Sequence, residues 1–292
     1  MTRTLRSATR VPAKSASQQH DKNGRIPIAD RGAQASGDAV QTLTSAIKLI
    51  PPAKSNLPGL DAEETRILRK KQQRLRASAQ SITRLASRYG NHITNALQAT
   101  YIFAQHEAGT AVCVGAAGWI LTCAHCFGES DDEWKTYRRK WLLSYSGVPV
   151  EVECVVWDSH RDLALGRIVC LEGASVPGGF AFVSLPPSSS ETADLYTRTP
   201  ILCIGQPGAD DLESERPRKT DYALVEISQG KLRGLIHEAD PQDNSEIGTL
   251  KHDAWTYWGH SGAPLLCRET GGLLGLHSSW DDETAMRHGV KI

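Results

Sequence analysis

A serine near the C-terminus is flanked by glycines in the segment Trp258-Gly259-His260-Ser261-Gly262-Ala263-Pro264. Because glycine lacks a Cβ, Gly259 lets the backbone turn its own N–H and that of Ser261 toward one point, where an oxyanion could be held. A serine hydroxyl attacks an amide only when a base takes its proton and a carboxylate orients that base. The segment therefore predicts a nucleophile, and its partners must come from elsewhere in the chain.

Two upstream segments supply these partners. His125 follows the apolar run that begins at Gly118 and ends in Cys123-Ala124-His125-Cys126, and Asp162 directly precedes the apolar run Leu163-Ala164-Leu165. Each feature alone is ordinary turn chemistry. Together, in the order His, Asp, Ser and each at a strand end or turn, they predict a catalytic triad.

The three segments resemble the motifs of the trypsin-like serine proteases, which read roughly T-A-A-H-C, D-I-A-L and G-D-S-G-G-P. The resemblance covers roughly the last 200 residues. It implies a mainly β fold of two six-stranded antiparallel barrels and a serine endopeptidase that acts on a peptide or protein substrate without metal or cofactor. In that chemistry Ser261 attacks, His125 moves the proton, Asp162 orients the histidine, and the N–H groups of Gly259 and Ser261 hold the oxyanion.

Two residues of the serine segment depart from the commonest motif. His260 stands where secreted trypsins have the aspartate that pairs with a new N-terminus, so we expect no activation by zymogen cleavage. Ala263 replaces a glycine, which is a mild change if its φ is negative.

Substrate specificity is suggested by a further resemblance to the glutamyl endopeptidase branch, carried by segments such as Ile204-Gly205-Gln206-Pro207-Gly208 and Gly275-Leu276-His277. The branch implies a binding pocket with a threonine and a histidine, which match Thr256 and His277, and Trp258 would lie on the same wall. A hydroxyl and an imidazole can hold a carboxylate or amide, so we expect acidic or amide side chains at P1. Basic P1 residues are disfavoured, since Trp255 stands where a carboxylate would be needed.

Short apolar runs separated by glycine or polar turns predict strands from about residue 81 onward. They include 99–104, 109–114, 118–122, 148–156, 163–170, 201–204, 222–227, 231–236, 264–267 and 273–277. We assign 81–292 to the protease domain, with barrel one over about 81–180 and barrel two over about 197–292. Pro186-Pro187-Ser188-Ser189-Ser190 is the expected linker between them.

The N-terminal part is strongly basic although the whole chain has no net charge. Residues 1–90 contain 17 Lys and Arg against 6 Asp and Glu, and the remainder contains 16 against 27. Residues 1–60 lack a sustained apolar period and are expected to form a disordered basic arm, followed by a helix over 61–80. We interpret the charge run of this helix first as a solvated face. Nucleic-acid contact, a nuclear address and docking on the acidic body are the alternatives.

The seven cysteines and the lack of an apolar secretion signal predict an intracellular protein, in the cytoplasm or nucleus. A basic N-terminus with Arg3, Arg6 and Arg10 makes the mitochondrion an alternative, and no apolar run is long enough to span a membrane. In secreted relatives the positions of Cys126 and Cys267 form disulfides, for which Cys113 and Cys203 would be the partners. In a reducing compartment we expect free buried thiols instead. We expect no zinc site at Cys123-Ala124-His125-Cys126, since no second ligand pair follows.

Two other function classes fit parts of the sequence. A catalytically silent protease fold could bind peptides or regulate a partner, although the complete triad argues against it. A nucleic-acid-associated protein could use the basic arm, but no aromatic residues interleave its charges to stack on bases.

Overall fold

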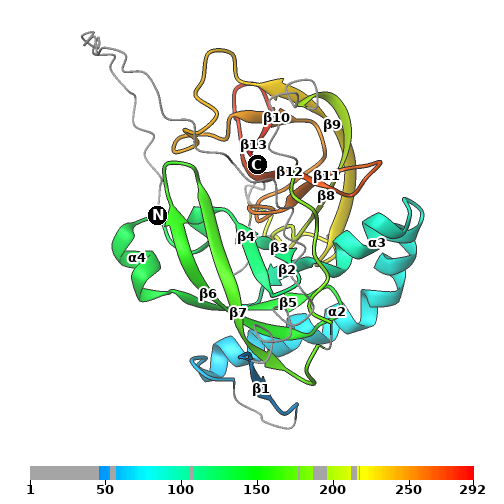
Figure 1. Cartoon of the computed structure of the whole chain (residues 1–292), viewed down its shortest axis with the longest axis vertical. Coiled ribbons are helices and arrows are strands. Elements are labelled where there is room, and N and C mark those ends of the chain that lie inside the picture. Colours follow the sequence, from blue (N-terminus) through cyan, green and yellow to red (C-terminus); the bar gives the residue numbers. More distant parts are fainter. Residues whose placement is uncertain are drawn as a thin grey trace, which may run out of the picture. The chain divides into compact units, whose positions relative to one another are not determined.

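The computed structural model describes residues 46–52, 57–105, 108–176, 178–186, 196–211, 216 and 218–292 (Figure 1). These residues belong to one compact unit. The expected disordered arm, up to residue 45, and the expected linker, from residue 187, lie outside the described residues.

The first half of the described chain forms a closed antiparallel barrel. Its six strands are β2 (Thr100–Phe103), β3 (Thr110–Gly115), β4 (Trp119–Thr122), β5 (Arg139–Ser144), β6 (Pro149–Asp158) and β7 (Leu163–Glu172). They pair in the order β7-β4-β3-β2-β5-β6, and β6 pairs again with β7 to close the ring. A short strand, β1 (Lys48–Ile50), adds to β7 in parallel, with Leu49 opposite Leu171.

The second half forms another closed barrel. Its strands are β8 (Thr197–Gly205), β9 (Glu226–Leu235), β10 (Leu250–His252), β11 (Pro264–Cys267), β12 (Leu273–Trp280) and β13 (Arg287–Lys291), in the order β10-β13-β12-β11-β8-β9. The expected mainly β architecture of two six-stranded antiparallel barrels is confirmed. Each barrel is closed, so the backbone of its strands is paired on both sides.

Three barrel strands were not expected from the sequence, namely β5, β10 and β13. Strands β10 and β13 are short and contain His252, Arg287 and His288, which break the apolar alternation. Both histidines are nevertheless buried, because closing the barrel covers them. The strands expected at 222–227 and 231–236 form one strand, β9, which begins only at Glu226 because the preceding residues belong to the loop between β8 and β9.

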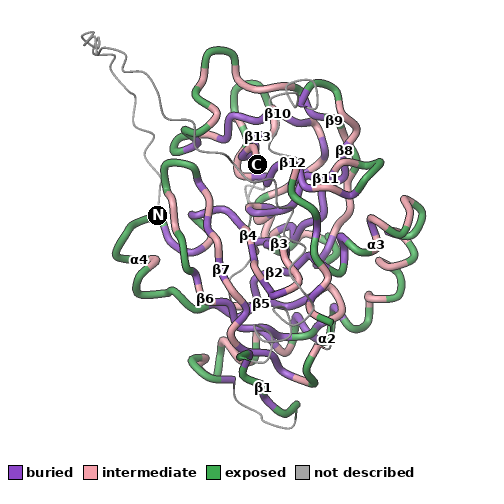
Figure 2. Tube along the Cα trace, in the orientation of Figure 1, coloured by how far each residue is buried: buried purple, intermediate pink, exposed green. Residues whose placement is uncertain are grey.

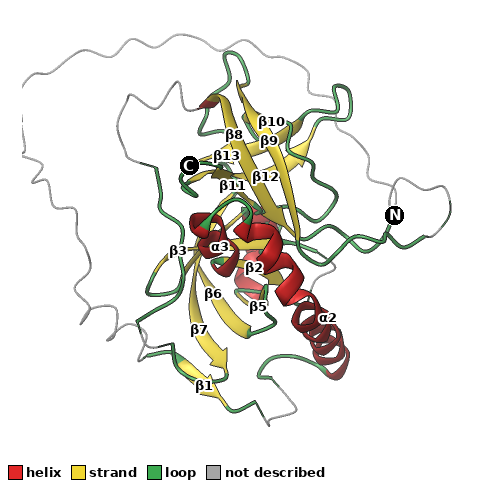
Figure 3. Ribbon diagram, turned by 90° about the vertical axis from the view of Figure 1, so that its right-hand side faces the viewer, coloured by secondary structure: helices red, strands yellow, loops and turns green. Residues whose placement is uncertain are grey.

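Two helices precede the first barrel strand (Figure 3). Helix α2 (Ala62–Ser87) begins after Asp61, whose side chain accepts from the Glu64 N–H while the Glu64 side chain accepts from the Asp61 N–H. This capping box satisfies two backbone donors at the helix start. The helix continues beyond residue 80 because buried Leu68, Leu75 and Ala86 extend its apolar seam. Helix α3 (Asn91–Gln98) follows, so the strands of barrel one begin at Thr100 rather than at about 81.

Part of the charge run of α2 packs against barrel one, which corrects the interpretation of a solvated face for that part, whereas Lys70, Arg74 and Arg76 are exposed as expected. Arg69 forms a two-pronged ion pair with Glu172 at the end of β7, with N···O distances of 2.7 and 2.6 Å. Lys71 is buried and donates to the Phe103 carbonyl at 2.9 Å, and Gln72 donates to the Gly147 carbonyl at 3.0 Å. The helix therefore binds the barrel through its polar side chains as well as through its leucines.

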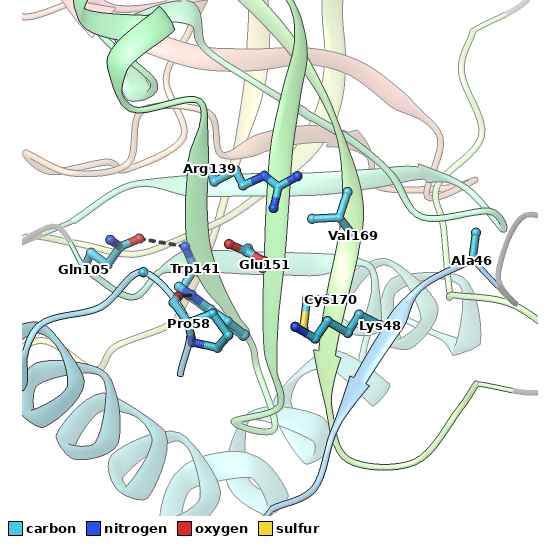
Figure 4. A pocket seen from close by; sticks show the side chains of 10 residues that line it. Ala46, Lys48, Pro58, Gln105, Arg139, Trp141, Glu151, Val169 and Cys170 are labelled. Carbon is cyan, nitrogen blue, oxygen red and sulfur yellow. Dashed lines mark hydrogen bonds between the residues drawn. The ribbon is translucent and has the colours of Figure 1, made fainter. Parts of the chain in front are cut away.

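A hollow of about 560 Å³ lies where the segment around β1 crosses barrel one (Figure 4). It is lined by Ala46, Lys48, Pro58, Gly59, Gln105, Arg139, Trp141, Glu151, Val169 and Cys170. Trp141 donates its indole N–H to the Pro58 carbonyl at 3.0 Å, which ties residue 58 to β5. Burial raises the pKa of the Glu151 carboxyl at the base of this hollow.

Buried residues concentrate on the strands, whereas α4 (Asp131–Thr136) has none (Figure 2). The largest fully buried side chains include Trp141, Phe103 and Phe127, all in or beside barrel one. All seven cysteines are free thiols; five are buried, whereas Cys126 and Cys267 are only half-buried. None of the helices in the described ranges is both long and apolar enough to cross a membrane.

Candidate active site

The barrel topology brings His125 and Asp162 together. Strand β4 ends at Thr122, and the one-turn 3-10 helix η1 (Ala124–Cys126) that follows carries His125. Asp162 ends the turn between β6 and β7, at φ 49°. Because β4 and β7 are antiparallel neighbours, with Thr122 opposite Ala164, the end of one strand meets the start of the other.

The Asp162 carboxylate orients the His125 ring. The His125 Nδ1 lies 2.9 Å from Asp162 Oδ1 and 3.1 Å from Oδ2, and the His125 backbone N–H also donates to Oδ1 at 3.2 Å. An ionised carboxylate only accepts, so the proton belongs on Nδ1 and the Nε2 lone pair is left to act as a base.

The charge of Asp162 is stabilised although the residue is buried. Burial by itself raises the pKa of Asp162, but the hydrogen bonds from His125 and from Ser278 outweigh it and hold the pKa below its ordinary value. Ser278 on β12 donates from Oγ to Asp162 Oδ2 at 2.7 Å. The sequence did not single out Ser278, although it directly follows His277.

Ser261 reaches the same region from barrel two, in the turn just before β11. Its carbonyl accepts from the Thr110 N–H of barrel one at 2.9 Å, which fixes the serine turn across the barrel boundary. Gly262 has φ +80°, and a Cβ there would overlap the Thr110 carbonyl oxygen, so only glycine fits after the serine. The Ser261 hydroxyl donates to the Ser278 carbonyl at 3.4 Å and, among the residues described, forms no hydrogen bond with His125.

Gly259 holds an arrangement suited to an oxyanion. Its φ is +97°, and the preceding carbonyl, that of Trp258, accepts from the Gly208 N–H at 2.5 Å. Since the carbonyl and N–H of one peptide unit point in opposite directions, this bond turns the Gly259 N–H away from Gly208. Within the described ranges, neither this N–H nor that of Ser261 has an acceptor. Gly208 was not identified from the sequence as part of this arrangement.

His260 anchors the serine segment as an uncharged group. It is 1% exposed, and burial lowers its pKa to about 4. Its Nδ1 lies within 3.1 Å of the Tyr257 backbone, and its ring packs edge-on against Trp255 at 5.5 Å between centroids. Ala263 does not have a positive φ, so its methyl group adds no backbone strain.

The three residues expected to bind substrate lie in different environments. Thr256 and His277 are buried, whereas Trp258 is 49% exposed. Trp255 and Tyr257 stack with ring planes 8° apart, and Tyr222 packs against both. These rings form an aromatic wall beside the serine segment.

Behind His277 lies a second buried histidine that the sequence did not indicate. His252 Nε2 is 3.0 Å from His277 Nδ1, and burial lowers the pKa of both rings, that of His252 to about 3. Arg287 is directly opposite His252 in the β10–β13 pair. The buried His252 Nδ1 and Arg287 Nε have no hydrogen-bond partner in the described part of the chain.

Two six-stranded antiparallel barrels with a histidine, an aspartate and a serine at their boundary define the two-barrel class of serine protease folds. A family model described as the trypsin-like peptidase domain matches residues 109–276, which include His125, Asp162 and Ser261. The match spans more than half of the chain, which therefore belongs to the trypsin-like peptidase family.

Comparison with solved structures supports the fold. A structure described as "HtrA-type protease AlgW with decapeptide" matches with a TM-score of 0.50 and 15% sequence identity. The match covers 70% of this chain and 63% of that chain, so this chain corresponds to less than two thirds of that protein. No curated protein sequence matches this chain significantly.

Proposed function

We propose that this protein is a serine endopeptidase that works through an acyl-enzyme. Ser261 is the nucleophile, His125 is the general base and then the general acid, and Asp162 orients the imidazole and stabilises its protonated form. The Gly259 and Ser261 N–H groups hold the oxyanion of the tetrahedral intermediate. The observation that carries the proposal is the Asp162 carboxylate, which accepts from the His125 ring, the His125 N–H and Ser278 at once.

The serine hydroxyl needs a small movement to enter this reaction. It now donates to the Ser278 carbonyl at the long distance of 3.4 Å, a weak bond that a rotation about χ1 replaces. Catalytic hydrogen bonds are often long without substrate and tighten in the complex. A peptide is the natural occupant, in keeping with the decapeptide that accompanies the matched HtrA-type protease.

The test is labelling with a fluorophosphonate probe, which reacts with an activated serine. Wild type and a His237→Ala control should label, since the His237 side chain is 91% exposed and lies outside the turns that carry the triad. Ser261→Ala and His125→Ala should not. If folded wild type fails to label and still binds peptides, the protein is a silent peptide-binding module and the proposal is wrong.

We also propose that the pocket selects acidic or amide side chains at P1, with the acidic ones preferred, in keeping with the resemblance to the glutamyl endopeptidase branch. If His252 Nε2 donates to His277 Nδ1, the proton of neutral His277 is on Nε2, where it can donate to a substrate carboxylate. Arg287 supplies the permanent positive charge, since its Nε–H can donate to the remaining His252 Nδ1. Thr256 supplies a hydroxyl.

This specificity is tested with peptide substrates that differ only in Glu, Gln, Phe or Lys at P1. Wild type should prefer Glu, and Arg287→Gln should lower the Glu-to-Gln ratio of kcat/KM by about tenfold, the size of one charge-assisted hydrogen bond. Arg268→Gln is the matched control, because Arg268 lies over Tyr89, away from the serine segment. Enrichment of neither acidic nor amide residues at P1 would exclude the assignment of Thr256 and His277.

A further inference from the structure

Cys123 places a thiol beside the triad, where the family motif has an alanine methyl group. The residue is fully buried, and its Sγ lies 3.4 Å from the His277 carbonyl oxygen. The Cys123 Sγ, a ring nitrogen of His125 and a carboxylate oxygen of Asp162 all lie within 4.8 Å of one another. Cys126, the second cysteine of the turn, has its Sγ 3.6 Å from the Ser261 carbonyl. The turn therefore brings a sulfur and a nitrogen ligand beside the carboxylate oxygen that Asp162 supplies from the turn between β6 and β7.

These three groups are the ligand types that zinc takes in proteins. Bond lengths of about 2.0–2.3 Å in a tetrahedral site put ligand atoms roughly 3.4 Å apart. The distance of 2.9 Å between His125 Nδ1 and Asp162 Oδ1 has to lengthen slightly, and the Cys123 Sγ has to move closer to both atoms. Side-chain rotations can make these adjustments. His125, whose side chain is 39% exposed, is the member through which an ion can enter.

Charge balance favours a divalent ion in this buried position. The Cys123 thiol is fully buried within 4.8 Å of the Asp162 carboxylate, so a thiolate there needs a cation beside it. One thiolate and one carboxylate neutralise a doubly charged ion, which removes the cost of burying net charge. Buried thiols without such neighbours, such as Cys203 in the core of barrel two, pack simply as small apolar groups.

We infer that Cys123, His125 and Asp162 form an inhibitory site for a thiophilic divalent cation such as Zn²⁺ or Cd²⁺, which replaces the expectation of no zinc at Cys123 to Cys126, because Asp162 adds a ligand from outside that segment. On binding, the thiol loses its proton to solvent and its sulfur bonds to the metal. The His125 proton moves from Nδ1 to Nε2, because Nδ1 cannot donate to Asp162 and bind a metal at once. With Nε2 protonated, His125 no longer accepts the serine proton, so metal binding and catalysis exclude each other. The inhibition rests on the proposed function, whereas the binding does not.

Metal binding is measured first without reference to activity. Cd²⁺ is titrated into reduced, full-length wild type, Cys123→Ala and Cys203→Ala, and the sulfur-to-cadmium charge-transfer absorption is recorded. Wild type and Cys203→Ala should bind one more Cd²⁺ through sulfur than Cys123→Ala. Equal titrations of wild type and Cys123→Ala would overturn the inference.

Inhibition is measured next by fluorophosphonate labelling at increasing Zn²⁺. Cys123→Ala restores the alanine of the family motif and should label as well as wild type when no metal is added. Zn²⁺ should block labelling of wild type, and a chelator should restore it. The Zn²⁺ concentration that blocks half of the labelling should be at least about tenfold higher for Cys123→Ala than for wild type. Equal sensitivity of both proteins to Zn²⁺ would also overturn the inference. If wild type does not label even without metal, the proposed function fails while the Cd²⁺ result still stands.

Discussion

Mild acid should destabilise this protein because three of the four buried histidines in its described ranges have a pKa far below the ordinary value and are neutral imidazoles in the folded state. The pKa of His252 is lowered to about 3, that of His260 to about 4, and that of His277 well below its ordinary value, in each case mainly by burial. In the unfolded chain each imidazole has its ordinary pKa of about 6.5. Below that pH the unfolded state binds protons that the folded state does not bind. The free energy of unfolding is therefore largest above pH 6.5 and decreases as the pH falls toward 4.

The expected loss is large compared with the stability of a domain. At pH 5 each unfolded imidazole is almost fully protonated, which costs the folded state roughly 2 kcal/mol per histidine. Three such residues together cost about 6 kcal/mol, and typical domains have only about 5–15 kcal/mol in total. Near pH 5 the unfolded state should bind about three more protons than the folded state, so the free energy of unfolding should change by about 4 kcal/mol per pH unit.

The measurement is urea unfolding followed by fluorescence between pH 5 and 7, a range above the titration of ordinary aspartates. His260→Gln should reduce the slope of unfolding free energy against pH by about a third, whatever its effect on stability itself. His237→Gln is the control, because the His237 side chain is 91% exposed. A stability independent of pH between 7 and 5 would show that the histidines are not buried as neutral groups.

Further predictions concern catalysis and the docked helix. Ser278→Ala removes the 2.7 Å donor to Asp162 and should lower kcat/KM by about 10- to 100-fold, whereas Ser279→Ala, whose hydroxyl accepts from the Gly248 N–H, should not. An unchanged kcat/KM in Ser278→Ala would contradict the role given to this hydroxyl. Arg69→Ala leaves the buried Glu172 unpaired and should cost about 2–3 kcal/mol of unfolding free energy. Arg66→Ala, which removes an exposed pair with Glu63, should leave the unfolding midpoint unchanged, and equal midpoints for the two variants would refute the docking argument.

The sequence predicted most of the barrel strands because each is a local pattern, whereas the arrangement in two barrels was implied by the resemblance to the trypsin-like serine proteases. An apolar run that ends in a turn identifies a strand wherever it lies, as in β4 before His125 and β7 after Asp162. The sequence did not predict β10 and β13, because buried histidines and an arginine interrupt the apolar alternation in these strands. The interpretation of α2 as having a solvated charged face was wrong for Arg69 and Lys71, because their partners lie 103 and 32 residues away in the sequence.

The sequence by itself determined the identity and order of the proposed triad residues, because each of the three motifs is a few residues long and its strand or turn context is local. Only the tertiary structure decided which other groups meet them. Ser278 reaches Asp162 across 116 residues, and the Cys123 thiol lies beside the His277 carbonyl 154 residues away. No periodic pattern in the sequence indicates such contacts. They form because the closure of the two barrels, and the packing of one barrel against the other, bring distant side chains together.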